Sequence, residues 1–336
     1  MMSRIRLTAA PFSAILSTPF RSGAGAPSGR ISVCRWSSTH AGPASGHSSL
    51  KLLTHQHFTE SGPGAFVSYD TAHAAQEDLR SQFLKWKSLP DEQQHVDVPR
   101  PHLISFEPTP TLTLGRRQPA LTPEQTSRFQ APLSVALHHR RKPVPEQTFI
   151  PNVRQTSRGG LTTYHGPGQL VLWPVLDMHS PLYAHYSVMS YASHLEATTR
   201  RLLGELFGLE TYTTREEPGV WVRTPAGQPE RKIAAMGVHH RRHVTALGIA
   251  VNIDVPVEGP EDANPWARFV PCGLEDKLVT SVAAELGESG DVALLDGWDI
   301  ASLADRWAVL FDEGLVNEAK RDVDGEVNSG LRRAAI

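Results

Sequence analysis

The chain has 336 residues, and 40% of them are hydrophobic, which is enough to bury a substantial core in one large domain or two small ones. A formal net charge of −2 argues against a general nucleic-acid binder, because neutralising phosphates requires a clear basic excess. No apolar run approaches the ~20 residues needed to cross a bilayer. We therefore expect a globular protein without a membrane span.

Residues 1–59 contain no Asp or Glu, although arginines are spread among Ser, Ala, Gly and Pro in this segment. An Arg-rich, Ser-rich and acid-free N-terminus is typical of an organelle transit peptide. A disordered tail is the plainer alternative, but such tails seldom exclude acids for so long, and a secretory signal needs a continuous apolar core. We expect residues 1–48 to be a mitochondrial transit peptide, which places the mature protein in the mitochondrial matrix.

The chain contains two cysteines, Cys34 and Cys272, without a CxxC pair or the Cys/His spacing of a zinc finger. Its 16 histidines are dispersed along the sequence. A disulfide framework and a metal site therefore have no support, and we expect no cofactor. Because Cys34 lies in the expected transit peptide, Cys272 is expected to be the single thiol of the mature protein.

Apolar periodicity gives a coarse outline of the fold. Folded sequence is expected from about Leu52, with amphipathic helices over residues 71–87 and 186–207, the second ended by Gly208. Strands and helices alternate without regular βαβ units, which indicates an α+β fold with a mixed sheet and helices mainly on one face. Shorter helices are predicted at 279–286 and 300–311, a frayed polar tail at 317–336, and strands at 66–69, 102–106, 111–114, 133–137, 170–173, 219–222, 232–239 and 243–254.

Residues 158–177, RGGLTTYHGPGQLVLWPVLD, concentrate glycines and hydrogen-bonding side chains directly before an apolar strand. Glycine allows positive φ and brings backbone amides close to a ligand. A glycine-rich hairpin is the plainer interpretation of such a cluster. The spacing matches neither GxxxxGK[ST] nor GxGxxG, so a nucleotide-binding loop has little support. We expect a binding loop at the edge of a strand.

The string RGGxxTYHGPGQLVxxP resembles the signature of the lipoyl(octanoyl) transferases, which move an octanoyl group from acyl-carrier protein to a lipoyl domain. Glu107-Pro108 followed by Thr113-Leu114-Gly115-Arg116 is similar to an early E-x-P…T-L-G-R pattern of that family. The resemblance spans roughly residues 66–286. It implies the fold shared by biotin-protein and lipoate-protein ligases, in one catalytic domain over residues 52–316.

The resemblance also implies an acyl-binding surface made by the glycine loop and two short strand segments with small residues. Burying six methylenes at ~0.8 kcal/mol each would stabilise an octanoyl chain by roughly 5 kcal/mol, enough to select a medium chain length. The implied residues are Arg158, Gly159, Gly160, Leu161, Thr162, Thr163, Tyr164, His165, Ala235, Met236, Gly237, Gly248, Ile249 and Ala250.

Two further residues are implied as catalytic. A lone cysteine is more often a small buried hydrophobe, and a lysine that opens a strand is usually solvated. However, Pro271-Cys272-Gly273 is similar to the family's catalytic cysteine motif, and K-I-x-x-x-G-V, beginning at Lys232, is similar to its lysine motif. The resemblance therefore implies Cys272 as the nucleophile and Lys232 as the group that favours its thiolate and shuttles protons, with Arg231 as a weaker candidate.

Some positions depart from the family pattern or stay outside it. Leu247 stands where many members have a histidine, so no role of that histidine is transferred. Residues 117–157 are expanded relative to bacterial members, and residues 154–157 fit the family pattern imperfectly, so Arg154 receives no catalytic weight. Residues 224–230 are a turn-rich insert. The basic runs 138–142 and 239–242 are solvated loops in the plainer interpretation. Our weaker hypothesis is that at least one of them docks acidic acyl-carrier protein or the lipoyl domain.

The primary hypothesis is an octanoyltransferase that needs neither ATP nor metal. Its acceptors would be lipoyl domains of 2-oxoacid dehydrogenase complexes and the glycine cleavage H protein. An ATP-dependent ligase of free lipoate is the nearest alternative, which the PCG cysteine opposes. A non-catalytic subunit that binds acyl-carrier protein or lipoyl domains is opposed by the retention of Lys232 and Cys272. A cysteine hydrolase is weakened because no histidine is tied by motif to Cys272.

Overall fold

The computed structural model describes residues 32–33, 50–61, 65–94, 96–137, 144–269, 277–290 and 298–333. Nearly all of the expected transit peptide therefore lies outside the described residues. Within them, no helix is both long enough and apolar enough to span a membrane.

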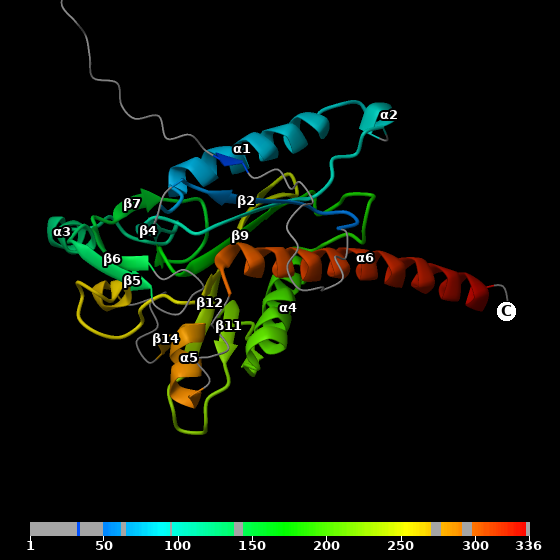
Figure 1. Cartoon of the computed structure of the whole chain (residues 1–336). Helices are drawn as coiled ribbons and strands as arrows, with labels where there is room; N and C mark the ends of the chain where they lie inside the picture. The colour runs from blue at the N-terminus through cyan, green and yellow to red at the C-terminus, as the bar shows by residue number, and fades with distance from the viewer. Residues whose placement is uncertain are drawn as a thin grey trace, which may run out of the picture.

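A mixed sheet forms the centre of the structure (Figure 1). Most neighbouring strands are antiparallel, but β2 (Thr54–Thr59) and β3 (His102–Phe106) are parallel, as are β12 (Arg231–Arg241) and β14 (Leu278–Val279). The α+β class expected from the sequence is thus confirmed. The spatial order is β1 (Ser32–Val33), β2, β3, β9 (Gln169–Val175), β13 (Val244–Asn252), β12, β11 (Gly219–Val222) and β10 (Thr211–Tyr212), with β14 beside β12.

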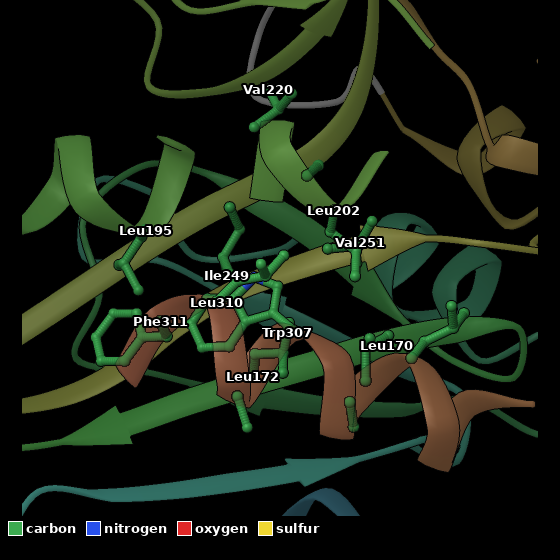
Figure 2. Close-up of a cluster of buried hydrophobic side chains, with 14 of the residues drawn as sticks. Leu170, Leu172, Leu195, Leu202, Val220, Ile249, Val251, Trp307, Leu310 and Phe311 are labelled. Atoms are coloured by element: carbon green, nitrogen blue, oxygen red, sulfur yellow. The ribbon is translucent and has the colours of Figure 1, made fainter. Parts of the chain in front are cut away.

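Each face of this sheet packs against a different layer, because side chains alternate along a strand. Leu170 and Leu172 of β9 belong to the larger core, which lies beneath α4 (Val188–Phe207) and α6 (Ile300–Arg333) and includes Trp307 (Figure 2). Val171 and Trp173 point to the other face, where α1 (Tyr69–Trp86) covers a smaller core. The expectation of helices mainly on one face was therefore incomplete, since α1 lies on the opposite face (Figure 1).

A second, smaller body of strands lies beside the main sheet. Strands β7 (Asn152–Gln155), β4 (Thr111–Leu114) and β8 (Thr162–His165) form a three-stranded sheet, and β5 (Leu133–Leu137) pairs with β6 (Val144–Phe149). Their apolar side chains share one core. The shorter helices are α2 (Asp91–Gln94), α3 (Pro123–Phe129), the 3₁₀-helix η1 (Pro265–Arg268) and α5 (Val282–Ser289).

Most expected elements are present, and the differences have local causes. The strands at 102–106, 111–114, 133–137 and 219–222 are confirmed, and Gly208 ends α4 with φ 66°. The strand expected at 66–69 is wrong: Val67 makes only an isolated bridge to Pro108, and Tyr69 already begins α1. The frayed tail expected from residue 317 is instead helical to Arg333, because that segment contains many good helix formers and no proline.

A buried carboxylate joins the first described residues of the main body to α6. Asp312 accepts hydrogen bonds from the backbone N–H groups of Lys51, Leu52 and Leu53 at 2.6, 2.8 and 2.7 Å. Its side chain is buried, so these charge-assisted bonds are shielded from water. This contact fixes where the chain enters β2.

We expect Asp312→Ala to lower the free energy of unfolding by about 3 kcal/mol, because three N–H groups lose a charged acceptor. The matched control is Asp305→Ala on the same helix, whose exposed carboxylate lies 3.0 Å from His55 Nδ1 and should contribute about 1 kcal/mol or less. Urea denaturation of both variants measures the difference. Equal losses in the two variants would contradict the anchoring role of Asp312.

Candidate active site

The glycine loop is held against the start of the segment that follows β4. The N–H groups of Gly115 and Arg116 donate to the carbonyls of Leu161 and Arg158 at 3.1 and 3.0 Å. A β-carbon on Gly115 would lie 2.4 Å from the carbonyl oxygen of Gly160, so only glycine permits this approach. The T-L-G-R segment therefore positions the loop by its backbone.

The other end of the loop is held at Gly168, which has φ +82°. Its N–H donates to Glu107 Oε1 at 2.6 Å, and its carbonyl accepts from the N–H groups of Ile253 and Asp254 at 3.0 and 2.9 Å. A β-carbon at this position would lie 2.7 Å from the Asp254 backbone. Glu107 thus has a structural task, which is to hold the end of the loop beside the end of β13.

Arg158 crosses from the loop onto the main sheet. Its guanidinium donates to the Thr113 carbonyl at 2.6 Å and to the Thr113 hydroxyl at 2.9 Å, and the side chain is buried. A β-carbon on Gly237 would lie 2.8 Å from Arg158 Cδ. Glycine at 237 is therefore needed for the arginine to lie against β12.

A chain of buried hydrogen bonds connects the glycine loop to β13 of the main sheet and to the residue that follows β14. His165 Nδ1 lies 2.8 Å from Gln169 Oε1, Gln169 Nε2 donates to Asn252 Oδ1 at 2.9 Å, and Asn252 Nδ2 donates to the Thr280 carbonyl at 2.9 Å. Because the Gln169 oxygen faces the ring, Nδ1 carries the proton and Nε2 is the basic nitrogen. The imidazole therefore has a fixed tautomer and orientation.

Burial lowers the pKa of His165 to about 4, with the hydrogen bond that His165 donates to Gln169 opposing the shift and the nearby Arg158 charge adding to it. The ring is consequently neutral at physiological pH. It can accept or orient a polar group through Nε2, but it does not supply a positive charge.

A cavity of about 40 Å³ lies where the loop meets β9, β12 and β13. The structure brings most of the expected acyl-binding residues to its wall: Arg158, Thr163, His165, Ala235, Met236, Gly237, Gly248, Ile249 and Ala250. Three residues that the sequence reasoning missed also line it, namely Tyr69, Trp173 and Leu247. Because side chains alternate between the two faces of β9, the sequence could have indicated that Trp173 faces the same side as Val171. No comparable local pattern marks Tyr69.

The remaining expected residues of the loop lie elsewhere. Leu161 and Thr162 line a second cavity of about 440 Å³ beside Phe269. Tyr164 is buried in the core of the smaller strand body, 5.6 Å from Trp266 between ring centroids. Thr162 and Thr163 face different cavities because successive side chains of β8 point to opposite sides.

Gly159 and Gly160 line neither of the two cavities described above. Gly160 takes φ +82° in the turn before β8, and both carbonyls lie close to Gly115. Their place is therefore in the support of the loop.

Lys232 lies near the start of β12 in a largely buried position. Its ammonium is 4.5 Å from the centroid of the Trp221 ring and donates to the Pro218 carbonyl at 3.3 Å. Burial raises the pKa of the nearby Glu196, against the opposing effects of the Gly219 N–H and the Lys232 charge. An ammonium over an aromatic face next to a buried carboxyl is a suitable place for a proton-transfer group.

A second lysine shares the same ring. Lys277 Nζ lies 4.8 Å from the Trp221 centroid and forms ion pairs with Glu217 and Glu230. Those carboxylates raise the pKa of Lys277, so it remains a fixed cation. Arg231 points to another partner, Glu285, at 2.8 Å.

The expected nucleophile Cys272 lies outside the described residues, in the segment 270–276. The described residues on either side of that segment are held by different contacts. Phe269 packs against Phe129 with ring centroids 5.9 Å apart, and Lys277 lies over Trp221. After the segment, the described chain resumes at Lys277 and enters β14, in which Val279 pairs with Lys232.

The two basic runs differ in what can be said of them. Residues 138–142 lie outside the described residues. In the other run, His240, Arg241 and Arg242 are exposed at the tip of the β12–β13 hairpin. Arg242 donates to the Lys87 carbonyl at 2.6 Å. Among the described residues, no three His, Cys, Asp or Glu side chains gather in a way that could hold a metal ion.

A family model described as the lipoyl protein ligase A/B catalytic domain matches residues 91–297. The chain is 39% identical over 169 residues to an octanoyltransferase of Mycobacterium leprae, covering 47% of this chain and 67% of that one. It is 40% identical over 146 residues to an octanoyltransferase of Mycobacterium marinum, covering 44% and 56%. The matches thus span between about half and two thirds of these relatives.

Solved structures give weaker likenesses. A bipartite lipoate protein ligase from Thermoplasma acidophilum has a TM-score of 0.37 and 15% identity, covering 71% of this chain and 88% of that one. A biotin protein ligase from Aquifex aeolicus has a TM-score of 0.33 and 14% identity, covering 48% and 61%.

The buried neutral histidine makes stability depend on pH. The folded pKa of His165 is about 4 and lies below the unfolded value of roughly 6.5, so acidification protonates the unfolded chain first. We therefore expect the free energy of unfolding to decrease as the pH is lowered from 6.5 to 4. His165→Gln should reduce that slope by about 1.4 kcal/mol per pH unit.

Chemical denaturation at a series of pH values measures this slope. His57 and His194 have pKa values that burial also lowers to about 4, so some slope should remain in the variant. His73→Gln is the matched control, because the His73 side chain is exposed on α1. Parallel curves for the wild type and His165→Gln would contradict the prediction.

Proposed function

The chain belongs to the family of lipoyl protein ligase A/B catalytic domains and is an acyltransferase of the octanoyltransferase kind, and we propose that octanoyl-acyl-carrier protein is its donor. The acceptor in this proposal is the ε-amine of a lysine on a lipoyl domain. Such domains occur in 2-oxoacid dehydrogenase complexes and in the glycine cleavage H protein. The transfer is the first step of protein lipoylation.

One observation supports this proposal above the others. Lys232 and Lys277 lie on the same Trp221 ring, and Lys277 directly follows the segment that contains Cys272. The described residue that follows the predicted nucleophile's segment therefore lies beside the predicted base, which supports the proposal. The apolar cavity opens beside the same strand, since Ala235, Met236 and Gly237 of β12 line it.

In the proposed first half-reaction, the Cys272 thiolate attacks the carbonyl carbon of the octanoyl thioester. The carbon–sulfur bond to the carrier breaks, and the released carrier thiolate takes up a proton. A free thiol has a pKa of ~8.5, so a nearby ammonium such as that of Lys232 increases the thiolate fraction and can supply this proton.

In the second half-reaction, the acceptor amine attacks the carbonyl carbon of the Cys272 thioester. An amide bond forms, the Cys272 thiolate leaves, and the amine's surplus proton passes to Lys232, which lost one in the first half. Cys272 and Lys232 thus return to their starting protonation states, and the reaction consumes no ATP. In this proposal the backbone amides of the glycine loop hold the carbonyl oxygen during both steps.

An ATP-dependent lipoate-protein ligase is the second candidate, because the matching family model is described as a lipoyl protein ligase catalytic domain. A non-catalytic subunit that binds lipoyl domains or acyl-carrier protein is the third. The exposed cations at the β12–β13 hairpin tip would serve docking of an acidic carrier in either the first or the third case.

We expect the wild type, mixed with octanoyl-acyl-carrier protein, to gain one hydroxylamine-labile octanoyl group by intact-protein mass spectrometry. Cys272→Ala should gain none. Lys232→Ala should lower kcat/KM for transfer to a lipoyl domain by roughly 10²–10⁴-fold, the usual contribution of a general acid–base group. Lys85→Ala, an exposed lysine on α1, is the matched control and should retain activity. Activation of free octanoate only in the presence of ATP would select the ligase instead.

The proposed location is the mitochondrial matrix, which the acid-free N-terminus supports. We expect residues 1–48 fused to a fluorescent protein to direct it to mitochondria in eukaryotic cells. A matched fusion with glutamate in place of the arginines should remain in the cytosol, because import presequences are positively charged. Diffuse cytosolic fluorescence of the unaltered fusion would contradict the proposal. The arginines replaced are Arg4, Arg6, Arg21, Arg30 and Arg35.

A further inference from the structure

Leu247 has an unusual backbone conformation for its place in the fold. Its φ is +60°, a region that bulky side chains rarely adopt. Among the described residues, the other non-glycine positions with positive φ, at 97, 242 and 243, lie outside strands, whereas Leu247 lies within β13. Such outliers persist only where the surrounding structure holds them, and they gather at functional sites.

The consequence of this φ is a break in the alternation of β13. Ile249 and Val251 point into the larger core, so an undisturbed strand would send Leu247 the same way. Instead, Leu247 packs in the smaller core together with Ala246 and Ala250. The strained backbone therefore turns a leucine away from the helices α4 and α6 and toward α1.

The ladder between β9 and β13 is interrupted at the same point. The paired register runs from Asn252 to Ile249, which lies opposite Leu172. A β-carbon on Gly248 would lie only 2.2 Å from the Leu172 carbonyl oxygen, so β9 approaches closely here. Backbone bonding between the strands resumes at Thr245, whose N–H donates to the Leu176 carbonyl at 2.9 Å.

The redirected side chain reaches the cavity of the candidate site. Leu247 lines that cavity together with Tyr69 and Trp173. The cavity has a volume of about 40 Å³, which admits only a few water molecules. An acyl chain that enters this cavity comes against the Leu247 side chain in its wall.

We propose that Leu247 is a specificity-determining residue, whose side chain limits the length of the saturated acyl chain that the cavity accepts. This inference rests on the proposed function, because it assigns the cavity to the acyl group. Leu247 sets the limit sterically and touches the hydrocarbon, with no part in bond making. Chains beyond the limit must push the leucine further into a packed core, and that displacement becomes costlier as the chain lengthens.

The first experiment measures binding of free saturated fatty acids from hexanoate to tetradecanoate by calorimetry. Leu247→Ala removes three carbon atoms, and we expect the preferred chain to lengthen by about two carbons. The affinity ratio of the longer to the shorter chain should rise about tenfold, as for a methylene gained in an apolar pocket. Leu247→Gly should shift the preference in the same direction, and it accepts positive φ without strain should the alanine variant fail to fold.

Val251→Ala is the matched control, because Val251 is fully buried on the same strand but faces the other core. This variant should lose stability and keep the wild-type order of chain lengths. A uniform loss of affinity for all chains in the Leu247 variants, or no saturable binding by the wild type, would overturn the inference.

The second experiment repeats the series with acyl groups on the carrier protein and a lipoyl domain as acceptor. A wild type that transfers no acyl group, combined with a shifted fatty-acid profile in Leu247→Ala, would refute the proposed function and support the role of Leu247 in the cavity. Transfer by the wild type with the same chain preference in all variants would overturn the inference and leave the proposed function standing.

Discussion

Backbone approach closer than any β-carbon allows is the constraint on which the candidate site depends. It occurs where Gly115 meets the carbonyl of Gly160 and again where Gly168 meets the end of β13 at Asp254. At Gly237 the neighbour is a side chain, that of Arg158. These contacts fix both ends of the glycine loop beside strands of two different sheets, and side-chain hydrogen bonds to Thr113 and Gln169 then orient Arg158 and His165.

The main sheet separates the larger hydrophobic core on one face from the cavity of the candidate site on the other. Beneath α4 and α6, large side chains such as Trp307 and Phe311 fill the core (Figure 2). The opposite face of β13 carries the small residues Ala246, Gly248 and Ala250, and the cavity of the candidate site lies on this face. One set of strands builds both layers, because alternate residues of β9 and β13 face opposite sides.

Electrostatics at the site follow from burial. His165 is neutral because the interior disfavours its charged form, and Gln169 orients the ring. Lys232 and Lys277 lie beside the face of Trp221, whose ring attracts cations, and Glu217 and Glu230 form ion pairs with Lys277. The ion pairs keep Lys277 charged, and Lys232 is the lysine that lies on β12 beside the strand segment lining the cavity.

The sequence by itself determined the α+β class, the strands at residues 102–106 and 219–222, and the end of α4 at Gly208. It also determined the glycine loop and, separately, the lysine motif that begins at Lys232. These features depend on local periodicity, on glycine conformations and on motif spacing, all of which are properties of neighbouring residues. Only the tertiary structure decided that Tyr69 reaches the cavity, that Thr162 and Thr163 serve different cavities, and that Leu247 leaves the face its strand would give it. Those outcomes arise from packing between segments far apart in the chain, where a neighbouring strand or helix outweighs the local pattern.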